Sequence, residues 1–476
     1  MTIQVRRSHK PGFRGEATSL RSGLWLLKSV SGRANDIIEL QDRQAKLPER
    51  AVIVGVQLGA ESEWEAEQSL NELEQLVITA GGEVVAREMQ HRDRPHVRTY
   101  IGPGKAEEIN QLALAHNAQL VVFDNDLSPS QQRNLEDIIS KVKIIDRTGI
   151  ILDIFALHAH SAEGKLQVEL AQLNYLLPRL RGMWQHLERE SQGGGRMSDR
   201  IGTRGPGETQ LETDKRIMRR RIQRLTAELG TLRNNRSTQR KRRQRNSVYS
   251  VALVGYTNAG KSTLLNALTG ADVLVEDKLF ATLDSTTRKL NVDHQKREIV
   301  ISDTVGFIKK LPHQLVAAFR STLDEVQLAD LLLHVVDASA EQMDEQIVAV
   351  EDVLKELGAE DKRQVLVFNK IDLISESEQL RLRKVYPESI LVSAANCIGL
   401  DGLREAIAEQ IRKSSVRLHL KVPYSRGEVL QRLHSVSLIV SEEHTEDGTN
   451  IVVDVPQADV DDYASFMVDA STPVDS

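Results

Sequence analysis

The apolar residues of this chain change their spacing several times, and each change predicts a different kind of structure. Short apolar runs at residues 51–56, 83–86, 119–123 and 142–145 alternate with stretches of helical period. Alternating strands and helices are typical of an α/β domain with a mostly parallel sheet. Within it, Ser128, Pro129 and Gln131 supply an N-cap, a first-turn proline and a capping-box partner, which predicts a helix start.

A second region carries leucines at alternating spacings of four and three. The first seam is Leu166, Leu170, Leu173, Leu177 and Leu180, and the second is Met218, Ile222, Leu225, Leu229 and Leu232. Two matching amphipathic helices predict an antiparallel helical hairpin over residues 161–246. Between them, residues 193–210 are rich in glycine and polar side chains. A connection of that length is either functional or disordered.

The third region opens with an apolar strand at residues 251–254, then a glycine-rich loop, then a helical run at 263–268. That context is typical of a phosphate-binding loop, whose backbone N–H groups and helix N-terminus cradle a polyphosphate. Lys261 is expected to reach the β- and γ-phosphates and Ser262 to bind Mg²⁺. The predicted loop consists of Gly255, Tyr256, Thr257, Asn258, Ala259, Gly260, Lys261 and Ser262.

The remaining elements of a GTP site follow in order along the chain. Asp303 ends a predicted strand and could hold Mg²⁺ through water, while the Gly306 N–H could sense the γ-phosphate. Asp372 could accept from guanine N1–H and the 2-amino group, which selects GTP over ATP. Thr282 is expected to complete the Mg²⁺ coordination, and with Lys261 and Gly306 it forms the predicted catalytic set. The further nucleotide-binding candidates are Phe280, Ala281, Leu283, Asp284, Thr304, Val305, Asn369, Lys370, Ile371, and Ser393, Ala394 and Ala395, whose backbone would meet guanine O6.

Phe307 stands where Ras-like enzymes place a glutamine that orients the attacking water. Slow intrinsic hydrolysis is therefore predicted, with completion of the site by a partner, a cation or both. Asn258 could hold K⁺, or it could only hydrogen-bond the loop. His334 lies inside an apolar strand and is predicted to be a core residue.

Composition narrows the class of protein. The chain has 476 residues, a net charge of −6 and a single cysteine, Cys397. This excludes an internal disulfide framework or a cysteine-based zinc site and suits a reducing cytosol. No apolar run reaches the ~20 residues of a membrane span. We expect a cytoplasmic monomer, with partial membrane association left open.

Positive charge is concentrated on the second predicted helix of the hairpin and its tail, where Glu228 is the one acid among many arginines. Such a run predicts contact with the phosphates of RNA, and the alternative is a solvated helix face. The RNA-binding candidates are Arg204, Arg219, Arg220, Arg221, Arg224, Arg240, Lys241, Arg242 and Arg243.

These patterns predict an α/β multidomain protein. Its parts are a basic, flexible extension (1–50), an N-terminal α/β domain (51–160), the helical hairpin (161–246), a Ras-like P-loop GTPase domain (247–413) and a small α+β module with an acidic tail (414–476).

The motifs at residues 205–214, 255–263 and 303–308, together with 145–149 and 311–319, resemble those of the HflX family of ribosome-associated GTPases. The resemblance implies binding to the large ribosomal subunit and its rRNA, ribosome-stimulated GTP hydrolysis with Mg²⁺, and splitting or rescue of stalled ribosomes under stress. It also implies that the glycine-rich loop reaches toward the peptidyl-transferase centre. Two alternatives stay open: large-subunit assembly, and a nucleotide-gated splitting wedge that does not need hydrolysis. ATP use is attributed to the N-terminal region of the family, but no motif in this sequence carries it.

Overall fold

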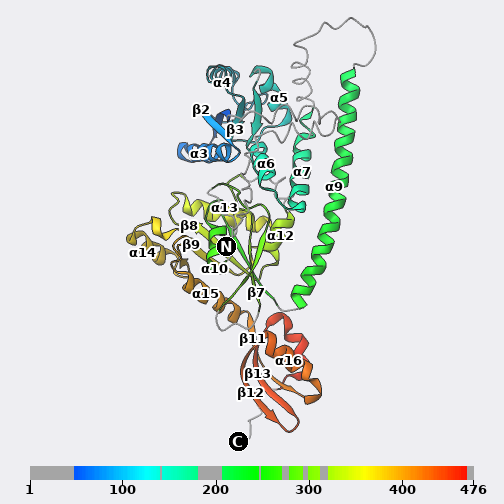
Figure 1. Cartoon of the computed structure of the whole chain (residues 1–476). Coiled ribbons are helices and arrows are strands. Elements are labelled where there is room, and N and C mark those ends of the chain that lie inside the picture. The colour runs from blue at the N-terminus through cyan, green and yellow to red at the C-terminus, as the bar shows by residue number, and fades with distance from the viewer. Residues whose placement is uncertain are drawn as a thin grey trace, which may run out of the picture. The chain divides into compact units, whose positions relative to one another are not determined.

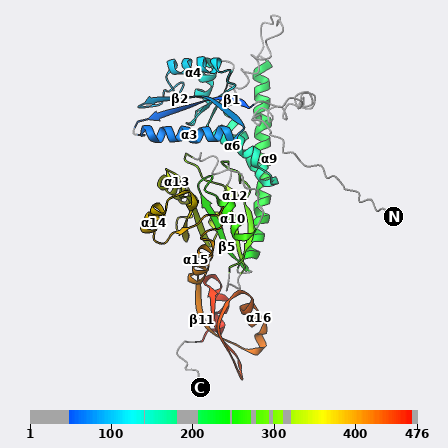
Figure 2. The same ribbon diagram turned by 60° about the vertical axis from the view of Figure 1, so that its left-hand side comes forward.

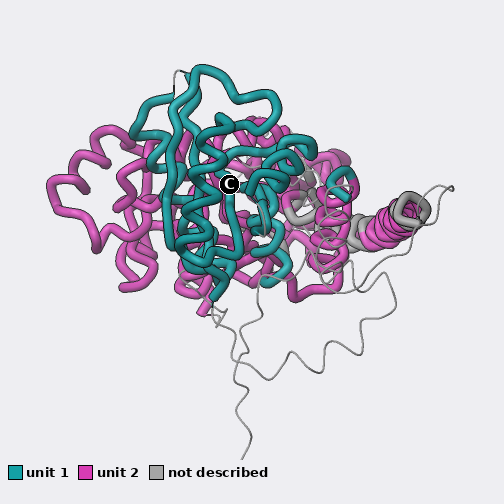
Figure 3. Tube along the Cα trace, turned by 90° about the horizontal axis from the view of Figure 1, so that it is seen from above, with its two compact units in different colours: residues 1–157, 178–203 teal, residues 158–177, 204–476 magenta. Residues whose placement is uncertain are grey.

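Two units divide the chain, one formed by residues 1–157 and 178–203 and the other by residues 158–177 and 204–476 (Figure 3). The computed structural model describes residues 48–59, 61–139, 142–180, 206–245, 248–270, 278–292, 298–310 and 320–468. The predictions for residues 1–47, for Arg204, for the motif at 311–319 and for the acidic tail after residue 468 lie outside these residues. No described helix is long and apolar enough to cross a membrane.

The first unit is built on a four-stranded parallel sheet of order β2-β1-β3-β4 (Figure 1). Its strands are β1 (Glu49–Leu58), β2 (Gly82–Arg92), β3 (Leu120–Phe123) and β4 (Lys143–Asp146). The connecting helices are α3 (Glu63–Thr79), α4 (Pro103–Ala115) and α5 (Pro129–Ile138), and α6 (Arg147–His158) follows β4. Helices α3 and α4 cover opposite faces of the sheet (Figure 2), which confirms the predicted α/β class.

The predicted start of α5 is confirmed in detail. Ser128 caps the helix by accepting from the Gln131 N–H, the Gln131 side chain returns to the Ser128 N–H, and Pro129 occupies the first turn. Each of these contacts satisfies a backbone group that the helix end would otherwise leave without a partner.

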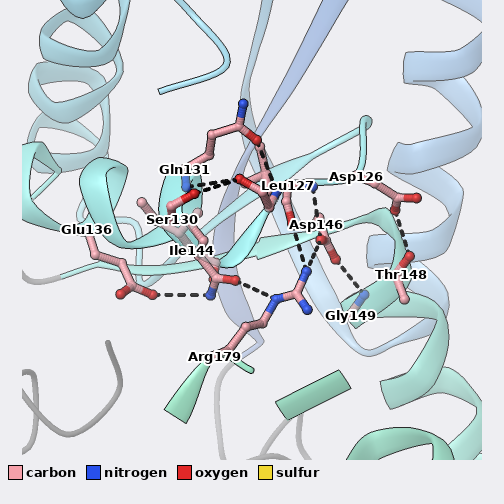
Figure 4. A network of polar contacts seen from close by, with 12 residues as sticks. Asp126, Leu127, Ser130, Gln131, Glu136, Ile144, Asp146, Thr148, Gly149 and Arg179 are labelled. Atoms are coloured by element: carbon pink, nitrogen blue, oxygen red, sulfur yellow. Dashed lines mark hydrogen bonds and ion pairs between the residues drawn. The ribbon is translucent and has the colours of Figure 1, made fainter. Parts of the chain in front are cut away.

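A buried polar network closes the carboxyl ends of β3 and β4 (Figure 4). The Arg179 guanidinium donates to Asp146 Oδ2 at 3.1 Å, to the Leu127 carbonyl oxygen at 2.7 Å and to Gln132 Oε1 at 2.9 Å. Asp146 also accepts from the backbone N–H groups of Leu127 and Gly149. Ligands of open α/β sheets usually bind at this edge. Here the described polar groups hydrogen-bond to one another.

Two helices of the second unit, α7 (Ala162–Leu176) and α9 (Pro206–Arg245), pack side by side (Figure 1). Val168 and Leu173 of α7 and Met218, Leu225 and Leu229 of α9 are buried. The first helix ends at Leu176, with Leu177 as its helical C-cap, and does not continue to Leu180 as predicted. Pro178 has no N–H with which to donate the next helical hydrogen bond.

The second helix begins earlier than predicted. Residues 206–210 were expected in the glycine-rich connection, yet Pro206 starts a helix of 40 residues. Proline is well suited to the first helical position because the N–H that it lacks has no helical partner there.

The part of the second unit that was predicted to be a GTPase domain has a six-stranded sheet of order β10-β9-β8-β5-β7-β6, in which the β6–β7 pair alone is antiparallel. The strands are β5 (Tyr249–Gly255), β6 (Thr286–Leu290), β7 (Ile299–Asp303), β8 (Leu331–Asp337), β9 (Gln364–Asn369) and β10 (Ile390–Leu391). The described helices are α10 (Lys261–Thr269), α12 (Arg320–Leu328), α13 (Met343–Glu356), the short η1 (Ile371–Leu373), α14 (Glu376–Val385) and α15 (Leu400–Lys413). Strands β5 and β8 are almost wholly buried, as expected of parallel strands covered on both faces.

The C-terminal part is the predicted α+β module. An antiparallel sheet of order β11-β13-β12 packs against one helix. Its elements are β11 (Ser415–Val422), η2 (Tyr424–Arg426), α16 (Gly427–Val436), β12 (Leu438–Thr445), β13 (Gly448–Pro456) and η3 (Gln457–Phe466).

Candidate functional site

The predicted phosphate loop joins β5 to α10, and two of its positions accept only glycine. Gly255 has φ 153° and Gly260 has φ 85°. A Cβ at Gly255 would collide with the Val335 carbonyl oxygen, and one at Gly260 would collide with the Asn369 amide. The loop can approach β8 and β9 this closely because Gly255 and Gly260 have no side chain.

Lys261 is buried at the base of this loop with 7 % of its surface exposed. Its Nζ donates to the carbonyl oxygens of Gly255 at 3.1 Å and Tyr256 at 2.8 Å. Burial lowers the pKa of Lys261 to about 8, and the nearby Asp303 only partly offsets the effect. An anionic phosphate beside Nζ would raise this pKa again, because it favours the charged form.

Three oxygen-bearing side chains meet at one corner of the site. Ser262 Oγ donates to Asp303 Oδ2 at 2.6 Å and lies 2.8 Å from Thr282 Oγ1. Burial raises the pKa of Asp303. Asp303 Oδ1 is also buried, with no hydrogen-bond partner among the described residues. A buried carboxylate oxygen without a partner, next to two hydroxyls, fits a hard divalent cation such as Mg²⁺.

Gly306 lies where an added side chain has no room. A Cβ there would approach Thr257 Cα to 2.9 Å and Lys261 Nζ to 3.2 Å. The next residue, Phe307, is 1 % exposed, and its backbone pairs with the loop through a 2.7 Å bond from the Thr257 N–H. The phenyl ring is a core group, and it offers no hydrogen bond to an attacking water.

Asn369 connects the phosphate loop to the predicted guanine loop. Its Nδ2 donates to the Ala259 carbonyl oxygen and its Oδ1 accepts from the Ala394 N–H, both at 2.9 Å. The Ala394 N–H was expected to face guanine O6. Since Asn369 occupies it, the Ala395 N–H is the better candidate for that contact. Asp372 is exposed in η1, as a base-reading carboxylate must be before the nucleotide binds.

A pocket of about 310 Å³ brings eleven of the predicted residues together. They are Thr257, Asn258, Gly260, Lys261, Ser262, Phe280, Ala281, Thr282, Thr304, Gly306 and Lys370. The pocket adds Thr263 and Lys278, which the sequence reasoning missed. Thr263 was interpreted only as part of a helix. Lys278 lies two residues before the predicted switch segment, and its basic side chain was the signal available.

The other predicted residues do not line the pocket. Its lining does not include Gly255, Tyr256, Ala259, Asp303, Val305, Asn369, Ile371, Asp372, Ser393, Ala394 or Ala395. Leu283 is a buried core residue.

Asp284 was predicted to bind nucleotide, but it points elsewhere. Its carboxylate accepts from the N–H groups of His160 and Ser161, at 2.9 and 2.6 Å, and from the Ser161 hydroxyl. These contacts lie at the N-terminus of α7. The prediction for Asp284 is therefore replaced by a capping role, which sequence spacing could not reveal because the partners lie 123 and 124 residues away.

His334 is 2 % exposed in β8, as the sequence suggested, and burial lowers its pKa to about 4. It is therefore neutral at physiological pH.

The arginines of the basic helix α9 are of two kinds, exposed ones and one that binds α7. Arg216, Arg219 and Arg220 are exposed, and Arg224 pairs with Glu228 on its own helix, at 2.9 Å. Arg221 differs, because both Nε and Nη2 bind the Glu169 carboxylate of α7, at 2.6 and 2.8 Å. It holds the two helices together, so it is the weakest of the predicted RNA contacts. The helix continues through residues 240–243, whose side chains lie outside the description.

Comparison with known families covers most of the chain. Residues 67–156 match the family described as GTP-binding GTPase N-terminal, residues 158–243 match GTP-binding GTPase Middle Region, and residues 250–370 match 50S ribosome-binding GTPase. The three matches follow one another in the order of the structural parts.

Individual relatives agree with these families. The chain is 47 % identical over 417 residues to the GTPase HflX of Caldanaerobacter subterraneus subsp. tengcongensis, covering 88 % of this chain and 93 % of that protein. It is 43 % identical over 403 residues to the GTPase HflX of Escherichia coli (strain K12), covering 84 % and 92 %. Among solved structures, a GTP-binding protein from Sulfolobus solfataricus in complex with GDP is 25 % identical, with a TM-score of 0.39, and covers 77 % of this chain and 99 % of that one.

Proposed function

The chain belongs to the HflX family of GTPases, and from that premise we propose that it docks on the large ribosomal subunit in its GTP form and splits or rescues stalled ribosomes. The GTPase activity and the ribosome-binding type of its GTPase domain come with the family. The splitting role, the rRNA contact and a cytoplasmic location are our proposal.

The residues of the pocket support a division of roles for GTP hydrolysis. Lys261 would pair with the β- and γ-phosphates, and Ser262, Thr282 and, through water, Asp303 would hold Mg²⁺, which when bound neutralises phosphate charge. The backbone N–H of Gly306 would face the γ-phosphate, and Asp372 would select guanine.

The attacking water has no side chain to orient it at position 307, because the Phe307 ring is buried. Stimulation from outside is therefore part of the proposal, and the large subunit is its natural source. Asn258, exposed in the phosphate loop with φ 61°, could add a K⁺ ion to the same site.

The observation that carries the ribosome-docking proposal is the two-sided character of α9. One face packs on α7 through Met218, Leu225 and Leu229, while Arg216, Arg219 and Arg220 stay exposed. Helix packing thus fixes the orientation of a strongly positive surface. Ordered phosphates, such as those of rRNA, are the partner that such a surface fits.

The test compares two triple variants that each remove three positive charges. Arg216, Arg219 and Arg220→Ala act on α9, and Arg381, Arg383 and Lys384→Ala act on exposed positions of α14 in the same unit. Binding to purified large subunits is measured against salt concentration. The α9 variant should weaken binding and flatten the salt dependence by ~0.9 in slope for each duplex phosphate that it no longer neutralises. Equal slopes for both variants would leave α9 as a solvated face.

Two other functions, a splitting wedge and a role in large-subunit assembly, are distinguished by separate experiments. Equal splitting with GTP and a non-hydrolysable analogue would favour a wedge driven by binding energy. Accumulation of precursor large subunits on depletion, without stalled mature ribosomes, would favour an assembly role.

A further inference from the structure

We propose that Asp284 is a positioning residue that couples the Mg²⁺ corner of the GTP site to helix α7. Its carboxylate completes the N-terminus of α7, while Thr282, two residues earlier, meets Ser262 at 2.8 Å. The inference concerns the GTPase cycle of the chain itself and does not rest on ribosome binding.

The cap is formed by both carboxylate oxygens. Oδ2 accepts from the N–H groups of His160 and Ser161, and Oδ1 accepts from the Ser161 hydroxyl. Ser161 Oγ in turn accepts from the Gly164 N–H at 2.9 Å, so Ser161 is the N-cap residue and Asp284 is the acceptor behind it. Helix N-termini favour negative charge, since their N–H groups lack partners and the helix dipole is positive there.

The first turn of α7 leaves space for the Asp284 carboxylate. Gly164 lies in the first turn of α7, and a Cβ at that position would collide with Asp284 Oδ1. The close approach of the carboxylate to α7 thus depends on Gly164 and Asp284, which are 120 positions apart in sequence.

The segment that joins Thr282 to Asp284 has little freedom to move. Leu283, between Thr282 and Asp284, is 1 % exposed, and Thr286 pairs with Asp303 at the start of β6. Consecutive Cα atoms are 3.8 Å apart, so Thr282 and Asp284 cannot separate by more than about 7.6 Å. A displacement of α7 that carried Asp284 with it would move Thr282 away from Ser262.

Coupling of this kind acts in both directions. When Thr282 is held in place by bound Mg²⁺ and γ-phosphate, Asp284 is held two residues away, and with it the cap of α7. If α7 or its partner α9 is displaced, Mg²⁺ binding weakens by the same factor, as thermodynamic linkage requires. The position of the α7–α9 pair then depends on which nucleotide is bound.

The test disturbs the contact from each side. Asp284→Ala removes the acceptor, and Gly164→Ala pushes it away from α7. Each should raise the Mg²⁺ concentration for half-maximal binding of a fluorescent GTP analogue by about fivefold, the effect of removing one helix cap. Asp284→Asn keeps an acceptor oxygen and should stay within about twofold of the wild type. Affinity for GDP without Mg²⁺ should not change.

Matched controls remove a cap or add a methyl group elsewhere in the GTPase part. Ser375→Ala removes the N-cap of α14, and Gly402→Ala adds a Cβ in α15 where no atom lies within 4 Å. Neither should alter the Mg²⁺ requirement.

Hydrogen exchange of the wild-type protein decides the matter independently of any variant. The amides of His160, Ser161 and the first turn of α7 should be better protected with Mg²⁺ and a GTP analogue than with GDP. Asp284→Ala should abolish that difference. Equal protection in both nucleotide states of the wild type, or an unchanged Mg²⁺ requirement in folded Asp284→Ala and Gly164→Ala, would overturn the proposal.

Discussion

The Asn369 side chain donates to the Ala259 carbonyl oxygen at 2.9 Å, which ties the end of β9 to the phosphate loop. The same side chain accepts from Ala394, so one buried amide holds both loops that must meet the nucleotide. Its role is structural support of the two loops that we propose to contact the nucleotide, and Asp372 is the residue proposed to bind the guanine base.

Replacing Asn369 should therefore weaken the whole site. Asn369→Ala leaves two buried backbone groups without partners, at about 1–3 kcal/mol each, and nucleotide affinity should fall by at least about tenfold. GDP and GTP should be affected alike, as measured by equilibrium binding. Asn396→Ala, at an exposed position of the same loop, is the control. Loss of GTP binding alone would show that Asn369 acts at the γ-phosphate and not on the two loops.

Gly306→Ala should separate binding from hydrolysis. Its Cβ would press on Thr257 and on Lys261 Nζ, which lie at 2.9 and 3.2 Å. We expect turnover to fall by about a hundredfold, the effect of one misplaced catalytic donor, with GDP affinity within about threefold of the wild type. Gly427→Ala, where the Cβ meets open space, serves as the control. Unchanged single-turnover hydrolysis would remove Gly306 from the catalytic set.

Nucleotide binding should take up a proton near pH 8. Burial holds the pKa of Lys261 at about 8 in the free protein, and bound phosphate raises it. At pH 8 about half a proton should therefore be absorbed for each nucleotide bound, and affinity should fall as the pH rises above this value. Calorimetry in buffers of different ionisation enthalpy measures the uptake, with Lys261→Arg as the control that stays charged. Binding heats that are independent of the buffer would contradict the assignment.

His334 should make the GTPase part sensitive to acid. Its pKa is about 4 in the folded protein and near 6.5 when unfolded. The unfolded state therefore takes up a proton first as the pH falls, and the stability present above pH 6.5 is lost between 6.5 and 4. The loss between pH 7.5 and 5 amounts to about 2 kcal/mol. Urea unfolding of wild type and His334→Leu at both pH values checks this. Equal losses in the two proteins would show that other groups carry the acid sensitivity.

Much of the fold could be predicted because the patterns were local. The capping box at Ser128, the phosphate loop after β5 and the four strand-and-loop elements of the GTP site all depend on neighbouring residues. Their geometry follows from backbone chemistry that a short stretch of sequence contains.

The predictions that differed depended on contacts distant in sequence. Asp284 was assigned to the nucleotide because Thr282 is close in sequence, whereas its partners are Ser161 and His160. Arg221 was grouped with a basic run, yet it pairs with Glu169 across the helices, 52 residues away. Helical period placed Arg221 on α9 but could not show which acid of α7 it would meet.

GTP turnover with and without purified large ribosomal subunits is the most direct test of the proposed function. Because Phe307 leaves the water unoriented, the protein alone should be slow, and large subunits should accelerate it by more than about tenfold. The Arg216, Arg219 and Arg220→Ala variant should lose most of that acceleration while keeping its basal rate. Full basal activity with no response to large subunits, although GTP is bound, would contradict a GTPase completed by the ribosome.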